Sequence, residues 1–150
     1  MAIEREDLLK HYRESRSKML AALDGLTDEQ MSEASIDGWA VKDHLAHLAL
    51  WDDIRAAEVE RISAGHESVW KMTEHQDEDH NAVGFELRKS ISAGQARWEL
   101  EHSRRRLLDA ITAAKPEALD PARYGAAGLR SQHEDQHSGW IARWRGDKGY

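Results

Sequence analysis

Two histidines near the C-terminal end of the sequence, His133 and His137, are four positions apart. On a helix this spacing places their Cβ atoms about 5–6 Å apart on one face. Two imidazoles so placed can converge on one divalent ion at distances of about 2.0–2.1 Å. Four apolar residues are expected on the same face: Leu129, Trp140, Ile141 and Trp144. We therefore expect both histidines to point into the protein.

Spacing alone leaves two interpretations of this pair open. A buried polar group without a hydrogen-bond partner costs about 1–3 kcal/mol, and one bound metal ion would satisfy both rings at once. Alternatively, both rings are ordinary core histidines that pair with carboxylates or backbone carbonyls, as most buried polar groups do.

A second group of histidines, in residues 43–51, offers a further ligand. His44 and Trp51 flank the apolar stripe of a predicted helix, and His47 lies at the edge of that stripe. A side chain at the rim of a core face can reach a facing helix across about 8–10 Å, so either His44 or His47 could meet the C-terminal pair. Three nitrogen ligands leave one position open for water or substrate, as in catalytic zinc sites. Trp51 would line the adjoining pocket or pack in the core.

The string from His133 to His137, HEDQH, also matches the HExxH motif of zinc proteases, in which Glu134 would be the general base. Those enzymes usually need another ligand downstream, and Asp147 is the one carboxylate after His137. They also normally contain a sheet, which this sequence does not predict. We interpret the match as coincidental and place Glu134 on the outer face of its helix.

The composition excludes several other classes of site. The 150 residues include no cysteine, which rules out disulfides, thiolate metal sites and cysteine nucleophiles. The formal net charge of −7 disfavours nucleic acid as a partner, because phosphate binding needs concentrated lysine and arginine. The short basic run Arg104–Arg106 is flanked by Glu99 and Glu101, and we predict that it is the solvated face of a helix.

No stretch of the sequence predicts a signal peptide or a membrane span. The N-terminal residues lack an unbroken apolar region, and no window approaches the ~20 apolar residues that a span requires. We therefore expect a cytoplasmic protein whose partner is a small molecule and which binds neither membranes nor nucleic acid.

Helical periodicity dominates the sequence and predicts four long helices without strands. Gly25 and Gly65 would end the first two helices, and a long polar segment, 66–80, would follow the second helix as a lid or binding loop. The predicted helices cover residues 3–23, 38–63, 81–90 continued by 92–114, and 129–145, with a loop at 115–128. The sequence thus predicts one domain, residues 1–150, folded as an all-α antiparallel four-helix bundle.

Local signals support these boundaries and the expected core. Thr27 with Gln30, and Ser92 with Gln95, have the spacing of capping boxes at helix starts. The first helix is expected to bury one apolar stripe. Its members are Leu8, Leu9, Tyr12, Met19, Leu20 and Leu23.

The other titratable residues have plainer interpretations. His11 and His102 project away from the core stripes of their helices and are expected in solvent. Asp43 and Asp52 lie near the second histidine group, but solvation of both would leave them no catalytic role, so no general base is identified. Three histidines of the polar segment are expected at the surface or in a lid over the site: His66, His75 and His80.

The DinB/YfiT-like superfamily has a second-helix signature that residues 38–51, GWAVKDHLAHLALW, resemble. The pair His133 and His137 resembles the histidines of its last helix, and residues 79–81 are similar to the subgroup that includes the colibactin self-resistance protein. The resemblance selects His47 rather than His44 as the first ligand. It implies a four-helix bundle, often a homodimer, with Zn²⁺ or Ni²⁺ held by His47, His133 and His137.

The resemblance also implies a range of activities. Some members of the superfamily are similar to transferases or isomerases that use mycothiol, bacillithiol or glutathione, and others to cyclopropane hydrolases. We therefore expect a divalent-metal-dependent enzyme that acts on a small electrophile. A low-molecular-weight thiol is a candidate cofactor, because the chain has no cysteine of its own.

Two other functions fit the same residues. The first is a non-enzymatic bundle that binds or sequesters a metal or a small ligand, and the second is a purely structural bundle with stacked core histidines. Trp98 falls opposite the core stripe of its helix and is a candidate contact of a homodimer.

Overall fold

The computed structural model describes residues 1–150, and α-helices account for most of them. The helices are α1 (Arg5–Leu23), α2 (Asp28–Ser32), α3 (Val41–Ser63), α4 (Glu74–Arg88), α5 (Ala93–Ala113) and α6 (His133–Lys148). Two short strands, β1 (Ala34–Ile36) and β2 (Trp39–Ala40), and two 3-10 turns, Pro116–Leu119 and Pro121–Arg123, complete the elements. The predicted all-α class is confirmed. None of the helices combines the length and the apolar composition that crossing a membrane requires.

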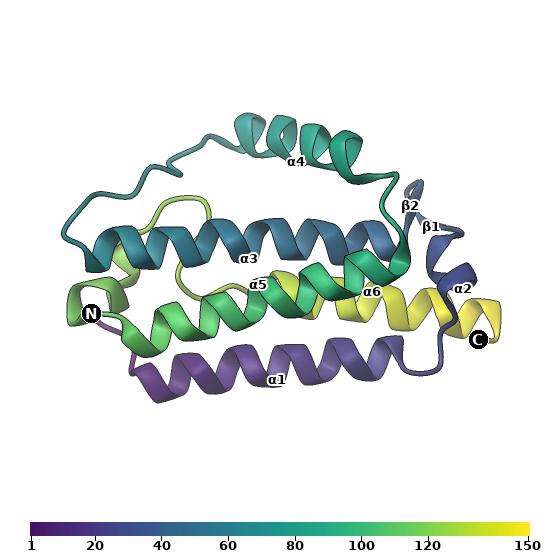
Figure 1. The fold of residues 1–150 in the computed structure, drawn as a ribbon, viewed down its shortest axis with the longest axis horizontal. Coiled ribbons are helices and arrows are strands. Elements are labelled where there is room, and N and C mark those ends of the chain that lie inside the picture. The colour runs from purple at the N-terminus through teal and green to yellow at the C-terminus, as the bar shows by residue number, and fades with distance from the viewer.

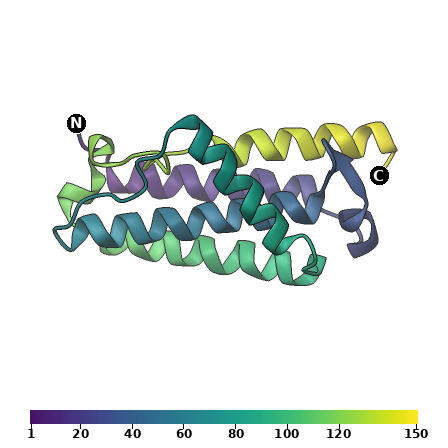
Figure 2. The same ribbon diagram turned by 90° about the horizontal axis from the view of Figure 1, so that it is seen from above.

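The long helices α1, α3, α5 and α6 lie side by side along the longest axis of the molecule (Figure 1 and Figure 2). Helices α3 and α5 run in the same direction, as two contacts between them show. Lys42 Nζ donates to Lys89 O near the start of both helices, and Arg106 pairs with Glu60 towards their other ends. Helix α4 makes this possible by returning the chain along the outside of α3 (Figure 1). The expected alternation of direction therefore fails at the step from α3 to α5.

Most of the apolar core lies in two large clusters, one at each end of the long helices, and a third, small cluster joins Trp51, Ile54 and Ala127. One large cluster includes Leu8 and Tyr12 from the first half of α1, and the other includes Met19 from its second half. The region between them holds polar residues, which form the site described below. Leu20 was predicted in the core but is 57% exposed, because each residue turns about 100° around a helix and Leu20 follows buried Met19 directly.

Capping explains where the helices begin. Thr27 and Gln30 form the predicted capping box at α2, with both hydrogen bonds present. At α5 only half of the predicted box forms, because Ser92 accepts from Gln95 N without the reciprocal bond. A third box, which the sequence analysis missed, joins Thr73 to Gln76. It starts α4 at Glu74, so the second half of the segment predicted as a polar loop is helical.

The last helix begins four residues later than predicted. His133 is its first residue, and the backbone N–H of His133 donates to Ser131 Oγ at 3.1 Å. Leu129 is buried as predicted, but from the preceding loop. Trp140 was expected on the core face with Ile141 and is instead 42% exposed. The core face of α6 is therefore narrower than its sequence suggests.

A two-stranded hairpin between α2 and α3 corrects the prediction that the chain has no strands. Ile36 pairs with Trp39, and the two residues between them both have positive φ, +51° at Asp37 and +82° at Gly38. Two consecutive left-handed residues make a type I′ turn, for which Asp-Gly is a preferred sequence. The Asp37-Gly38 dipeptide was therefore the available signal for this hairpin.

Replacement of Gly38 by alanine is expected to lower the free energy of unfolding by about 1–2 kcal/mol, because an L-residue in a left-handed conformation is strained. Gly139→Ala provides a matched control. Gly139 lies inside α6 and an added Cβ would meet no atom within 4 Å, so this change should stabilise by about 0.5–1 kcal/mol. Urea unfolding of both variants measures the difference, and equal shifts would contradict the assignment of the turn.

Candidate metal centre

Three imidazole rings from two distant parts of the chain meet in the middle of the molecule. His47 Nε2 lies 2.9 Å from His133 Nε2, and His137 Nε2 lies 3.0 Å from the same atom. Each of the three residues offers one ligand nitrogen, and these three nitrogens all lie within 4.8 Å of one another. Helix α3 contributes His47, and one face of the first two turns of α6 contributes the other two. The structure thus brings together the three residues that the resemblance selected.

His44 contacts one member of this group without belonging to it. Its Nδ1 lies 2.7 Å from His137 Nδ1, on the side of the His137 ring opposite the Nε2 contact with His133. The rings of His44 and His137 meet edge to face at 5.0 Å between centroids. The spacing allowed either His44 or His47 to meet the C-terminal pair. Both reach α6, but only His47 has a nitrogen in the converging group.

Burial holds these rings in their neutral form. Loss of solvation lowers the pKa of His44 to about 4 and that of His133 to about 4. Loss of solvation, together with the smaller effect of the neighbouring histidines, lowers the pKa of His47 to about 3 and that of His137 to about 2. A neutral imidazole carries one nitrogen lone pair, which is the form that binds a metal.

The donor set fits a divalent transition metal better than it fits mutual hydrogen bonding. Two nitrogens that share a tetrahedral ion at 2.0–2.1 Å are about 3.3 Å apart, close to the distances from His133 Nε2 to His47 and His137. Without an ion, a neutral imidazole nitrogen is either a donor or an acceptor, so His133 Nε2 would have to serve two neighbouring nitrogens through a single site. One cation accepts all three lone pairs at once.

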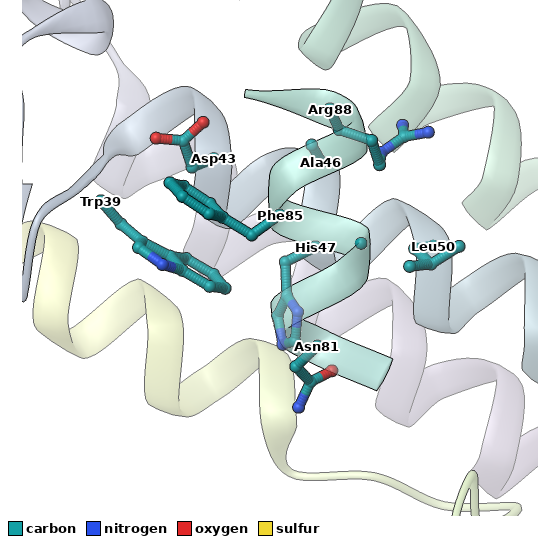
Figure 3. Close-up of a pocket in the computed structure, with 9 residues that line it drawn as sticks. Trp39, Asp43, Ala46, His47, Leu50, Asn81, Phe85 and Arg88 are labelled. Carbon is teal, nitrogen blue, oxygen red and sulfur yellow. The ribbon is translucent and has the colours of Figure 1, made fainter. Parts of the chain in front are cut away.

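Helix α4 covers the α3 side of the centre. Figure 3 shows the His47 ring beneath α4, between Trp39 and Asn81. Trp39 stacks on Phe85 of α4 at 5.2 Å between ring centroids and meets the His47 ring edge to face. Trp51 Nε1 donates to Asn81 Oδ1 at 2.8 Å. Trp39 and two residues of α4, Asn81 and Phe85, thus cover one side of His47.

Trp51, the other predicted pocket residue, is buried and has two kinds of neighbour. It lines a small internal cavity together with His133 and Asp52. On its outer side its ring meets that of His80, which also packs against Trp70. His80, a residue of α4, is thus half-buried against the two tryptophans, whereas His66 and His75 are exposed as predicted.

A network of buried charged residues lies beside the centre. It includes Arg104, Asp52 and Glu134, which were expected in solvent. Arg104 Nε donates to Asp52 Oδ2 at 2.8 Å, and Arg104 Nη2 pairs with Glu134 Oε2 at 2.6 Å. Arg16 Nε bonds Glu134 Oε1 at 2.7 Å, and Arg55 Nη1 bonds Asp52 Oδ1 at 3.2 Å. Arg104, Asp52 and Glu134 are each less than 5% exposed. The network ties α1, α3, α5 and α6 together beside His133.

The positions of these charges carried a signal that the sequence analysis did not use. Asp52 lies seven residues after buried Leu45, and Glu134 lies seven residues before buried Ile141. Residues seven apart share a helix face, so charged residues stood on the core stripes. Buried charges require partners, and arginines on neighbouring helices provide them here.

Two further residues lie elsewhere than predicted. His11 is buried, with Nε2 2.6 Å from Ser131 O, rather than exposed. Asp43 accepts a hydrogen bond from Ala40 N at 2.8 Å and so caps the start of α3. His102 is exposed as expected, and it stacks on Trp98, which is 61% exposed.

The metal-free protein is expected to lose stability as the pH falls from about 6.5 towards 4. In this window the unfolded chain protonates its histidines while the four buried rings stay neutral, so the unfolded state binds more protons and acid favours unfolding. Each such histidine contributes up to about 1.4 kcal/mol per pH unit. Urea unfolding in chelator at several pH values measures the slope. His44→Phe should reduce it, whereas His102→Phe should not, and a flat profile would contradict the burial of neutral rings.

Solved structures share this fold. An uncharacterised protein from Escherichia coli UTI89 superposes with a TM-score of 0.81 at 15% sequence identity, over 97% of this chain and 94% of its own. A protein from Streptococcus pneumoniae superposes with a TM-score of 0.76 at 11% identity, over 97% of this chain and 92% of its own. At these identities the likeness concerns the fold alone.

A mycothiol-dependent maleylpyruvate isomerase is a third structural neighbour, with a TM-score of 0.64 and 20% identity. The match covers 93% of this chain but only 58% of the isomerase, which is therefore the longer protein. No curated protein matches the sequence significantly. The sequence pattern of the DinB superfamily, however, matches residues 11–141, a range that includes His47, His133 and His137. The chain therefore belongs to the DinB superfamily.

Proposed function

We propose that this protein is a divalent-metal-dependent enzyme that acts on a small electrophilic molecule, as a thiol-dependent transferase or isomerase or as a hydrolase. One observation carries the proposal: three neutral histidine nitrogens from α3 and α6 converge within 4.8 Å of one another in the interior. Three imidazole ligands leave a coordination position open, which distinguishes catalytic from structural zinc sites.

In this proposal His47, His133 and His137 hold the ion, and Zn²⁺ or Ni²⁺ suits their nitrogens. When bound, such an ion lowers the pKa of a coordinated water or thiol, or polarises a substrate carbonyl. The Arg104 network keeps α6 in position against α3, so that the three rings stay aligned. Since the chain has no cysteine, a thiol nucleophile would come from a low-molecular-weight cofactor.

A non-enzymatic metal- or ligand-binding bundle is the second candidate. It is favoured by the structural contacts that occupy three of the nearby carboxylates. Asp43 caps α3, and Asp52 and Glu134 are both paired with arginines. An enzyme with this site would therefore rely on the coordinated nucleophile itself.

A turnover assay separates the two candidates. Zinc- or nickel-loaded protein is mixed with a panel of low-molecular-weight thiols and electrophiles, with and without a chelator. The enzyme proposal expects product formation that stops on chelation and returns when metal is added. His133→Ala should be inactive, and His75→Ala, which changes an exposed histidine of α4, should be fully active. Absence of turnover in metal-loaded protein would favour the binding function.

We also propose that the protein forms a homodimer through the outer face of α5. Trp98 exposes most of its indole there, stacked on His102, and large exposed aromatic surface often marks a contact area. Sedimentation should detect a species of twice 17.1 kDa that Trp98→Ser reduces to the monomer. A wild-type species of 17.1 kDa would overturn this part of the proposal.

A further inference from the structure

The position of His133 depends on more than its own helix, because His133 is the first residue of α6. Helix ends fray, and Gln132, which precedes α6, provides no side-chain cap. The backbone N–H of His133 donates instead to Ser131 Oγ at 3.1 Å. His47, by contrast, lies within the 23 residues of α3. The residues that lead into α6 must therefore help to place the His133 ring.

Arg55 of α3 binds the first part of residues 127–131, the lead-in segment of α6. Its Nε donates to Ala127 O at 3.0 Å and to Gly128 O at 2.9 Å, and its Nη2 donates to Ala127 O at 2.8 Å. Its Nη1 donates to Asp52 Oδ1 at 3.2 Å. Arg55 thus joins the lead-in segment to the network of buried charged residues.

Two neighbouring residues of α1 bind the second part of the lead-in segment. The Tyr12 hydroxyl donates to Leu129 O at 2.5 Å, and His11 Nε2 lies 2.6 Å from Ser131 O. A carbonyl oxygen only accepts hydrogen bonds, so His11 carries a proton on Nε2 and donates it. We call His11, Tyr12 and Arg55 the carbonyl clamp.

The lead-in segment depends on the carbonyl clamp for the hydrogen bonds of four carbonyls. No backbone N–H donates to these carbonyls, which belong to Ala127, Gly128, Leu129 and Ser131. His11, Tyr12 and Arg55 are all buried, and a buried polar group that loses its partner destabilises the fold. All four carbonyls are satisfied only when the segment lies against both α1 and α3.

Ser131 connects the carbonyl clamp to the metal centre. Its carbonyl accepts from His11, and its side-chain oxygen accepts from the backbone N–H of His133. A shift of Ser131 would therefore move the first turn of α6. Groups in a site must stay within about 0.5 Å of the productive geometry, and His133 Nε2 is the atom that His47 and His137 both approach.

We propose that the carbonyl clamp positions His133 for metal binding. His11, Tyr12 and Arg55 are then positioning residues of the metal centre, although none of them supplies one of the three converging nitrogens. This inference rests on the proposed function, because it concerns the same centre. It also gives α1 a role there, since α1 contributes no ligand and yet holds the segment that ends at Ser131.

A pair of tyrosine variants tests the proposal in the intact protein. Tyr12→Phe removes one hydroxyl–carbonyl bond of the carbonyl clamp. Tyr124→Phe is the matched control, because the Tyr124 hydroxyl donates to Ala118 O at 2.6 Å, outside the clamp. Both changes should lower the midpoint of urea unfolding. Only Tyr12→Phe should weaken zinc binding, by about fivefold, the effect of one hydrogen bond, as measured by competition with a chelating dye.

A second set of variants removes and then restores the donor of His11. His11→Phe should also weaken zinc binding about fivefold. His11→Gln, which returns an N–H donor to this position, should recover part of the loss, and His102→Phe, on the exposed face of α5, should change nothing. The visible absorption of cobalt-loaded protein, which reports the geometry of the ligands, should change in Tyr12→Phe and His11→Phe but not in the two controls.

The zinc affinity of the wild-type protein separates this inference from the proposed function. Circular dichroism first establishes that each variant is folded, and if Tyr12→Phe does not fold, the His11 variants carry the comparison. Wild-type affinity in both Tyr12→Phe and His11→Phe would overturn the role of the clamp alone. Equal losses in Tyr12→Phe and Tyr124→Phe would show that affinity follows stability, and would also overturn it. Failure of the wild-type protein to bind zinc would overturn the metal centre, and the clamp would lose its role with it.

Discussion

Replacement of His133 by alanine lowers the affinity for zinc or nickel by more than a hundredfold. His133 Nε2 is the atom that both other histidines approach, at 2.9 and 3.0 Å, so its removal leaves two ligands at most. Apparent binding free energies of about 10–16 kcal/mol for four-ligand zinc sites correspond to about 3 kcal/mol for each ligand, and every 1.4 kcal/mol is a factor of ten. Competition with a chelating dye measures the change.

The same variant should lose the thermal stabilisation that metal gives. At a metal concentration of about 100 times Kd, binding stabilises the native state by about 2.7 kcal/mol, which is about 5–10 °C in Tm for a chain of this size. The wild-type protein should show this shift and His133→Ala should not. His102→Ala, on the exposed face of α5, should behave as wild type. If metal shifted the Tm of His133→Ala and wild type equally, the three-histidine centre would be wrong.

Replacement of Arg104 by methionine is expected to destabilise the protein by about 3–5 kcal/mol, the cost of removing one partner from a buried ion-pair network. Asp52 keeps Arg55 and Glu134 keeps Arg16, but the two buried carboxylates lose the cation that they share. Arg104 contacts both Asp52 and Glu134, and it also donates to Tyr12 O at 2.8 Å. Methionine fills much of the same volume, so the loss reflects the two carboxylates rather than a cavity. The expected fall in Tm is about 6–20 °C.

Arg105→Met is the matched control for this experiment. Arg105 follows directly in the sequence but is exposed and pairs only with Glu101 on the same helix. Exposed pairs contribute about 0.2–1 kcal/mol, so its Tm should change little. Chemical denaturation in chelator removes the contribution of any bound metal from both measurements. Similar unfolding free energies for the two variants would show that the network does not support the fold.

The network also explains how the centre is held together. The polar residues lie between the two apolar clusters, where Asp52, Glu134 and Arg104 replace the apolar side chains expected at those helical positions. A buried ion pair is costly unless its geometry is good, and this one links four helices. His133 and Glu134 are adjacent, so the network fixes the first turn of α6 where the histidines must converge.

Several features of the fold followed from the sequence alone. The spacing of apolar residues predicted the long helices, and their all-α class is confirmed. The residue types at 38–51 and the pair His133 and His137 predicted membership of the DinB superfamily, which is also confirmed. These signals are local: they depend on helical periodicity and on motifs within one helix turn or two, which the chain carries wherever it folds.

Other features depended on contacts between distant segments. The parallel course of α3 and α5, the pairing of Arg104 with Glu134, and the exposure of Trp140 reflect how helices pack, which spacing along one helix does not contain. The capping box of Thr73 and Gln76 indicates the early start of α4, and the Asp37-Gly38 dipeptide indicates the hairpin turn. Both signals were missed, because short polar motifs are weaker than the helical pattern around them.

The sequence by itself determined which residue types could act together: histidine nitrogens at helical spacing, no thiol, and a net negative charge. Only the tertiary structure decided that His47 converges with His133 and His137 while His44 meets the far nitrogen of His137. The physical reason is that the two histidines of α3 are less than one helical turn apart, so periodicity makes them nearly equivalent. The crossing of α3 and α6 removes that equivalence.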